Sequence, residues 1–139
     1  MKTKKLKYKP EFEFELIGIS TIEDDYKISW AINKCLDIKL QRDDNLEIKN
    51  EKKSTVQSFS VFKGFFSGTG DKIKLVANKS FEGFLIEELK NIDFFLVIYS
   101  DKEKSPVKII IKELKSNSAI NIALIIDPNK LKSKEKLLF

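Results

Sequence analysis

Histidine is absent from this chain of 139 residues, and cysteine, arginine and tryptophan occur once each. Without histidine, the chain lacks the activating base of Ser-His and Cys-His catalysis and the commonest transition-metal ligand. The single thiol, Cys35, cannot form an internal disulfide. It lies on the apolar face of an expected helix, which is typical of a small core residue. These absences exclude most hydrolase templates. We expect no metal and no cofactor, and a non-catalytic role is favoured.

Long apolar runs are also missing. The longest ones, residues 92–99 and 119–126, fall far short of the roughly 20 residues that span a bilayer. The lysines near the N-terminus are not followed by the apolar segment of a signal peptide. Hydrophobic residues make up 42% of the chain and charged residues 34%, a globular balance. We therefore expect one cytoplasmic domain over residues 1–139, with no membrane contact.

The net charge of +5 is concentrated at the two ends of the chain. Residues 1–9 contain five lysines and no acid, and residues 129–139 carry a net charge of +3, so the body carries −3. Every basic residue except Arg42 is a lysine, whereas base readout and bidentate phosphate contacts favour arginine. We interpret the lysine-rich ends as solvated. Nucleic-acid binding is left as the third reading, in a weak, non-specific and salt-sensitive form.

The first third of the chain predicts a strand and a helix. Residues 12–19 alternate apolar and acidic side chains, as in a half-buried strand with an acidic outer face. Ser20 and Glu23 have the spacing of a capping box, and Asp24 and Asp25 follow in the first turn, where the helix dipole favours negative charge. A helix is expected over about residues 21–37. Its core-facing stripe has i, i+3, i+4, i+7 spacing and consists of Ile28, Ala31, Ile32 and Cys35.

The rest of the chain predicts a mostly antiparallel sheet. A polar turn at 41–45 precedes strands at 46–50, 56–66 and 72–78, and residues 81–89 suggest one or two helical turns. Residues 94–99 and 119–126 are apolar on both faces, as central strands are, and flank a helix at about 106–116. This β-α-β unit at 93–126 normally forms a crossover between parallel strands. The predicted class is α+β, with five to six strands in a mixed sheet and two main helices.

The strongest candidate for a binding surface is the Trp30 side of the first helix. Tyr26, Trp30 and Asn33 form a second stripe beside the core-facing one, which implies burial from two sides. The second cover is either the apolar end of the chain at 137–139 or another protein, including a second copy. Aromatic anchors of this kind are enriched at interfaces. We therefore expect a protein-binding or self-associating protein, with a homodimer through this face as one form.

The alternative to a protein-binding surface is a site built from carboxylates. Asp24, Asp25, Arg42 and Asp43 are candidates for a small-ligand site or a carboxylate-dependent enzyme, with Arg42 orienting a carboxylate. Adjacent acids on a helix point about 100° apart, so they cannot share a proton or a metal without help from another element. Capping of the helix start explains the first pair, and a loop turn explains Asp43 with Asp44.

Several segments resemble the IPExxxVDY family of small proteins. They are LIGIS, DYKISWAINK and DDNLEI, together with Asn78-Lys79 and the ending IIDPNKLKSKEKLLF. If residues 120–128 correspond to the signature that names the family, Ile120 and Asp127 agree with it and Ile126 replaces valine. Asn121, Ile122 and Pro128 depart from it. The resemblance implies no catalytic residue, cofactor or substrate.

Overall fold

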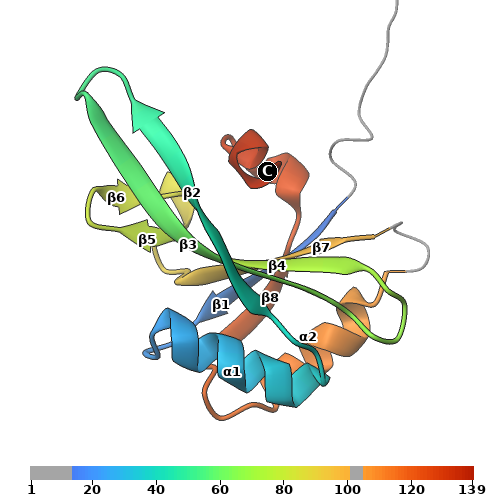
Figure 1. The fold of residues 1–139 in the computed structure, drawn as a ribbon. Coiled ribbons are helices and arrows are strands. Elements are labelled where there is room, and N and C mark those ends of the chain that lie inside the picture. The colour runs from blue at the N-terminus through green and yellow to red at the C-terminus, as the bar shows by residue number, and fades with distance from the viewer. Residues whose placement is uncertain (1–13, 101–104) are drawn as a thin grey trace, which may run out of the picture.

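Six strands form one sheet in the computed structural model, which describes residues 14–100 and 105–139. Their order is β2-β3-β4-β7-β1-β8, and every neighbouring pair is antiparallel. Both helices lie on one face of the sheet, and the C-terminal turns lie on the other (Figure 1). The elements of the main sheet and its helices are β1 (Glu15–Ser20), α1 (Asp25–Leu36), β2 (Gln41–Asn50), β3 (Thr55–Phe65), β4 (Lys72–Ala77), β7 (Phe94–Tyr99), α2 (Val107–Lys115) and β8 (Ile122–Ile126). The shorter elements are β5 (Lys79–Ser80), β6 (Gly83–Phe84), η2 (Glu87–Leu89), η4 (Pro128–Lys130) and η5 (Lys134–Leu137).

This arrangement confirms the predicted α+β class, the two helices and the β2-β3-β4 meander. The strand-helix-strand unit is also present, and β7 and β8 run in the same direction because both are antiparallel to β1. They are not neighbours, however, because β1 lies between them. None of the helices in the described ranges has the length and apolar character needed to cross a membrane.

The centre of the sheet is buried on both faces. On the helix side, Leu96 and Ile98 of β7 pack with Ile32 of α1 and Ile110 of α2. On the opposite side lies a second core, whose members include Phe14, Leu16, Phe59, Phe95 and Leu137. Gly18 in β1 leaves room for this packing, because a Cβ there would lie 2.7 Å from Cδ1 of Ile126 and the end of that side chain would have to shift.

A buried asparagine shapes the excursion between β4 and β7. Asn78 is fully buried, and its side-chain amide donates to the carbonyls of Leu89 at 2.9 Å and Ile92 at 2.8 Å. Its carbonyl oxygen accepts from the amide of Ile86 at 2.7 Å. Three backbone groups of an irregular segment are thereby satisfied without water. This lets Leu85 and Ile86 enter the second core.

Three sequence predictions about the first half are corrected. The helix begins at Asp25 rather than near residue 21, because Asp24, not Ser20, caps it. Ser20 instead ends β1. The predicted half-buried first strand is buried on both faces within β1, because it lies between β7 and β8. The predicted turn at 41–45 belongs to β2, which absorbs its two acids through a register shift between Asp43 and Leu46.

Two further predictions about the end of the chain are wrong. Residues 122–126 form an edge strand rather than a central one, and Ile122, Leu124 and Ile125 are exposed. The apolar end at 137–139 does not cover the Trp30 helix, because it joins the core on the opposite face. The lysine-rich segment 129–139 is therefore part of the fold, with Lys136 donating to the carbonyl of Leu85 at 3.2 Å. The other lysine-rich end, 1–9, lies outside the described residues.

The C-terminal turns also bury a tyrosine side chain and change its pKa. The ring of Tyr99 lies 6.2 Å from that of Phe14, and its hydroxyl donates to the carbonyl of Leu137 at 3.5 Å. Burial raises the pKa of Tyr99 from 10.0 to about 12. Beside it, burial lowers the pKa of Lys74, whose ammonium group lies 4.2 Å from the centre of the Phe139 ring.

We predict that this burial makes the protein sensitive to alkali. Because the folded pKa of Tyr99 exceeds the unfolded one, its contribution is complete below pH 10 and is lost as the pH rises toward 12. The free energy of unfolding should fall by about 2 kcal/mol over that range from this group, and Tyr99→Phe should remove this part of the fall. Urea titrations at several pH values measure it, with Tyr26→Phe as the matched control. An unchanged alkaline fall in Tyr99→Phe would contradict the assignment.

Candidate functional site

The turn before α1 is fixed to two distant parts of the chain. The hydroxyl of Thr21 donates to the carbonyl of Ala119 at 2.6 Å, and its amide donates to Oδ2 of Asp93 at 2.9 Å. Asp24 then caps α1 by accepting from the amide of Lys27 at 2.9 Å. The start of α1 is thereby held against the beginning of β7 and the loop that precedes β8.

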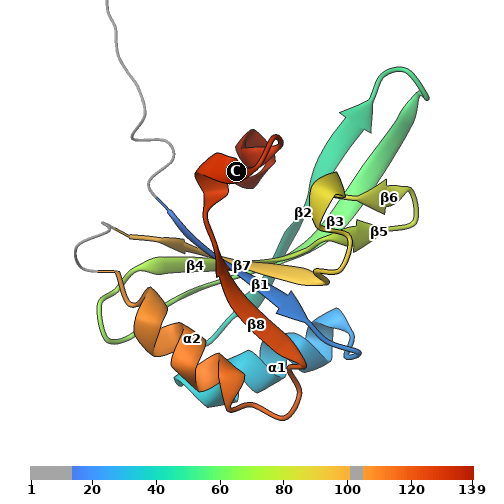
Figure 2. The same ribbon diagram turned by 180° about the vertical axis from the view of Figure 1, so that it is seen from behind.

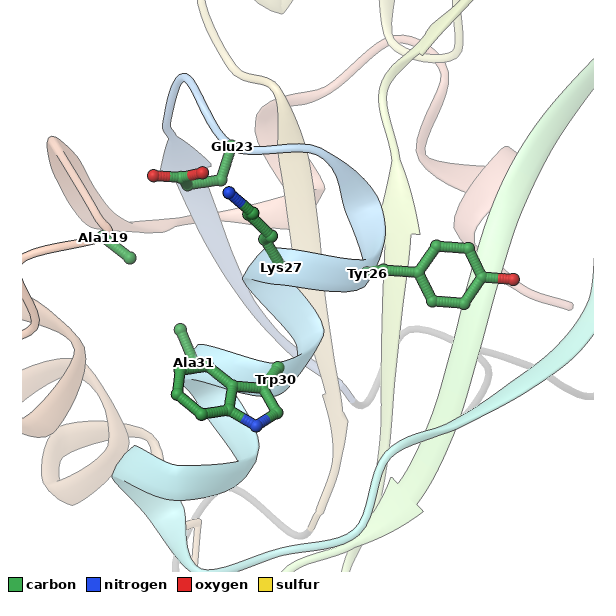
Figure 3. A pocket seen from close by; sticks show the side chains of 6 residues that line it. All are labelled: Glu23, Tyr26, Lys27, Trp30, Ala31 and Ala119. Carbon is green, nitrogen blue, oxygen red and sulfur yellow. The ribbon is translucent and has the colours of Figure 1, made fainter.

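A groove opens between α1 and that loop, and we call it the Trp30 groove. It has a volume of about 440 Å³ and is lined by Glu23, Tyr26, Lys27, Trp30, Ala31 and Ala119. Figure 3 shows Glu23 and Lys27 on the side of the helix that faces Ala119, with the Trp30 ring at the other end of the groove. The walls at Trp30, Ala31 and Ala119 are apolar, whereas the end at Glu23 and Lys27 carries both signs of charge.

Trp30 is the largest exposed feature of this groove. Its side chain is 62% exposed, although tryptophan is the residue with the greatest apolar surface to bury. The ammonium group of Lys34 lies 4.8 Å from the centre of its ring, a cation–π contact that is worth about 0.5–1 kcal/mol at an exposed site. Much of the indole surface remains open to solvent.

The predicted stripe of Tyr26, Trp30 and Asn33 divides into three roles. Tyr26 points away from Ala31 toward β3 (Figure 3), where its ring meets Phe62 edge-on at 5.6 Å. Asn33 accepts from the amide of Leu40 at 2.7 Å and donates to its carbonyl at 3.3 Å. Asn33 therefore fixes the link between α1 and β2, whereas Tyr26, which is 64% exposed, and Trp30 both line the groove with open aromatic surface.

A second groove, the hairpin groove, lies between the start of α1 and the β5-β6 hairpin. Its volume is about 800 Å³, and hydroxyl and amide side chains from β2, β3 and β5 line much of it. Its rim carries Ile22, which is 89% exposed, and Phe81, which is fully exposed. Asp93 also lines it, but this carboxylate is engaged by Lys79 at 2.5 Å and by the amide of Thr21.

The four charged ligand candidates do not come together at one groove. Asp24 and Asp25 line the hairpin groove, where Asp24 caps α1 and Asp25 accepts from the amide of Tyr26 at 2.8 Å. Arg42 and Asp43 line neither groove.

Arg42 and Asp43 instead support the irregular pairing of β2 with β3. The guanidinium of Arg42 donates to the carbonyl of Val61 at 3.1 Å and lies 5.5 Å from the centre of the Phe62 ring. Asp43 accepts from the backbone amide of Asp44 and lies 3.6 Å from Lys63, and both contacts lower its pKa. These contacts give the single arginine and its acidic neighbour Asp43 a structural role in the pairing of β2 with β3.

Within the described ranges, no cluster of three or more His, Cys, Asp or Glu side chains could hold a metal. Cys35 is half-buried, and its thiol donates to the carbonyl of Glu113 at 3.1 Å. Burial raises the pKa of Cys35, which lowers the thiolate fraction that a nucleophile needs. Cys35 thus ties α1 to α2 and packs against the core on the helix side.

Ile22, Phe81 and Ala119 line these grooves but were not among the predicted site residues. Ile22 follows Thr21 in a polar turn, where an apolar side chain has little core within reach, and this isolation was a usable signal. Phe81 belonged to the helical turns expected at 81–89, but it lies in the turn between β5 and β6. Ala119 gave none, because only the fold brings the loop before β8 against α1.

Comparison of the chain with family models, curated proteins and solved structures finds no match. The resemblance to the IPExxxVDY family stays a prediction.

The contacts of Asn33 and Trp30 predict unequal effects on stability. Asn33→Ala leaves both backbone groups of Leu40 without their side-chain partner and should lower the free energy of unfolding by about 2 kcal/mol. Trp30→Ala removes a largely exposed ring and should change it by less than about 1 kcal/mol. Chemical denaturation followed by circular dichroism compares the two. A larger loss for Trp30→Ala would show that Trp30 is part of the core.

Proposed function

We propose that this protein is a binding module that docks another protein through the Trp30 groove. The observation that carries this proposal is the 62% exposure of Trp30, which contacts Lys34 and lies beside an apolar groove of about 440 Å³. Burying the open surface of such a ring is worth about 3 kcal/mol, and aromatic anchors of this type dominate binding energies at interfaces. Exposing it without a partner brings no benefit to stability.

The lining of the groove defines what fits it. Trp30, Ala31 and Ala119 suit an apolar side chain of the partner, and the small alanines let that side chain approach the backbone of α1. Glu23 and Lys27 then offer one acceptor group and one donor group at the polar end. A partner with an apolar anchor flanked by polar groups would match both ends, which is the usual organisation of a protein interface.

The alternative reading, a small-ligand site, rests on the hairpin groove. This groove is larger and more polar, and its volume falls within the range of ligand sites. Asp24 and Asp25 are already engaged with the backbone at its edge, and Asp93 with Lys79. The Trp30 groove is therefore favoured, and variants at each groove separate the two readings.

The proposal is tested by comparing three variants as bait for binding proteins. Trp30→Ala removes the anchor of the Trp30 groove, and Phe81→Ala alters the rim of the hairpin groove. Phe65→Ala is the matched control, because Phe65 is 59% exposed and lines neither groove. We expect a partner that wild type, Phe65→Ala and Phe81→Ala retain and that Trp30→Ala loses at least tenfold, as loss of an anchor implies.

The same partner must then bury Trp30. Because Trp30 is the only tryptophan of this chain, a partner or peptide that contains none leaves its fluorescence as a direct report. Titration with the purified partner should shift the emission to shorter wavelength and reduce quenching by acrylamide. A partner that leaves both signals unchanged at saturation, or that Trp30→Ala still binds, overturns the proposal. Loss of binding in Phe81→Ala alone would favour the hairpin groove.

A further inference from the structure

The outer edge of β8 is an apolar surface that the fold leaves unpaired. Among the described residues, β8 is paired only with β1, and it ends the sheet on the side nearest the viewer in Figure 2. Its side chains are open on both faces of the sheet. Ile122 and Leu124 are 53% and 40% exposed on the face of the second core, and Ile125 is 47% exposed on the helix face. An edge of this kind is a template for another strand.

The two edges of the sheet differ sharply. At the opposite edge, β2 carries Arg42, Asp43, Asp44 and Glu47, and a register shift interrupts its pairing. Charges and bulges of this kind are the usual means of preventing edge-to-edge pairing. The β8 edge has neither, because residues 116–126 contain no charged side chain in a chain that is 34% charged. The fold thus protects one edge and leaves the other open.

We propose that two copies of this chain associate through antiparallel pairing of their β8 strands. The strand is complementary to itself about Leu124, because this register places Leu124 opposite Leu124 and Ile122 opposite Ile126 on one face. It also places Ala123 opposite Ile125 on the other face. All these pairs are apolar, and no charge is brought into the seam. The pairing satisfies the free backbone groups of both strands and joins two six-stranded sheets into one.

A second copy fits this edge because it supplies the same patch in the symmetric way that most small oligomers use. Helix α2 adds a recognisable electrostatic signature. Helix α2 packs against both α1 and β8, and the main-chain carbonyl of its Glu113 accepts from Cys35 of α1. Helix geometry places Lys108 and Lys115 on the flank of α2 opposite Glu113, which is the flank away from α1. Two such flanks approach each other in the dimer. Self-association should therefore strengthen at high salt, which screens the repulsion between these lysines. An acidic partner strand would instead bind more weakly at high salt, because its attraction to the lysines would be screened.

This dimer is independent of the proposed protein-binding function. The axis of antiparallel pairing keeps the helix faces of the two sheets on the same side, so both Trp30 grooves point the same way, and none of their lining residues belongs to β8. Trp30 fluorescence should therefore not change when β8 pairs. Two grooves on one face would give the dimer a bivalent binding surface.

Sedimentation velocity over a range of concentrations tests the pairing. Wild-type protein at tens of micromolar should sediment as a dimer, more completely at high salt than at low salt, with unchanged Trp30 emission. Leu124→Lys should weaken association at least tenfold, because it places a lysine opposite its own symmetry mate. Val56→Lys is the matched control, since Val56 is 49% exposed and lies on β3 away from this edge, and it should dimerise like wild type.

A cysteine at position 124 keeps the test decisive if Leu124→Lys fails to fold. In a Cys35→Ala background, Leu124→Cys should form an intermolecular disulfide under mild oxidation, because directly opposed residues lie within disulfide reach. Val56→Cys in the same background should not. A wild-type monomer at both salt concentrations, or a dimer that Leu124→Lys leaves intact, overturns the proposal. So does a dimer that shifts Trp30 emission and that Trp30→Ala abolishes, since it would use the Trp30 groove instead.

Discussion

The central strands are buried on both faces, and this burial determines where the helices and the C-terminal turns must lie. β7 alternates between the two cores, with Leu96 and Ile98 facing the helices and Phe95 and Val97 facing the C-terminal turns. The side chains on each face of the sheet need their own covering elements, because the hydrophobic effect stabilises the fold in proportion to the apolar area removed from water. A chain of this size must therefore build two covers from few residues.

The two covers are built differently. On one face, α1 and α2 present regular apolar stripes to the sheet. On the other face, the cover is irregular, and it depends on Asn78 to satisfy the backbone between β4 and β7 and on the C-terminal turns that bring in Leu131 and Leu137. With both covers in place, exposed apolar side chains adjoin one another on the outer side of α1 and along β8. Other large apolar side chains are exposed in other elements, namely Ile22, Val56, Phe65, Phe81 and Ile109.

The local patterns predicted most elements, and the errors came from long-range order. The i, i+4 stripes of α1 and α2 and the meander of β2 to β4 follow from short-range periodicity, so sequence was sufficient. The residues of β8 read as a central strand because an uncharged apolar run looks the same at an edge. The segment with Asp43 and Asp44 was predicted to be a turn, because the local sequence of a register shift within a strand looks like that of a turn.

The candidate site was predictable in part for the same reason. Trp30 stood out by its rarity and its place beside the core-facing stripe, and it does lie at a groove. Its expected companion Asn33 belongs instead to the link with Leu40, and the wall opposite Trp30 comes from Ala119, almost ninety residues later. Such pairings depend on which segments the two-sided core brings together, and no short pattern encodes them.

Hydrogen exchange with mass spectrometry can show whether the surfaces left open by the two-sided core are the binding surfaces. Exchange is compared for dilute protein, concentrated protein and protein with the captured partner. We predict that the backbone amides of residues 122–126 exchange more slowly on concentration alone and that those of residues 23–31 exchange more slowly only with the partner. Protection confined to the charged edge strand β2, or no local protection in either comparison, would contradict this prediction.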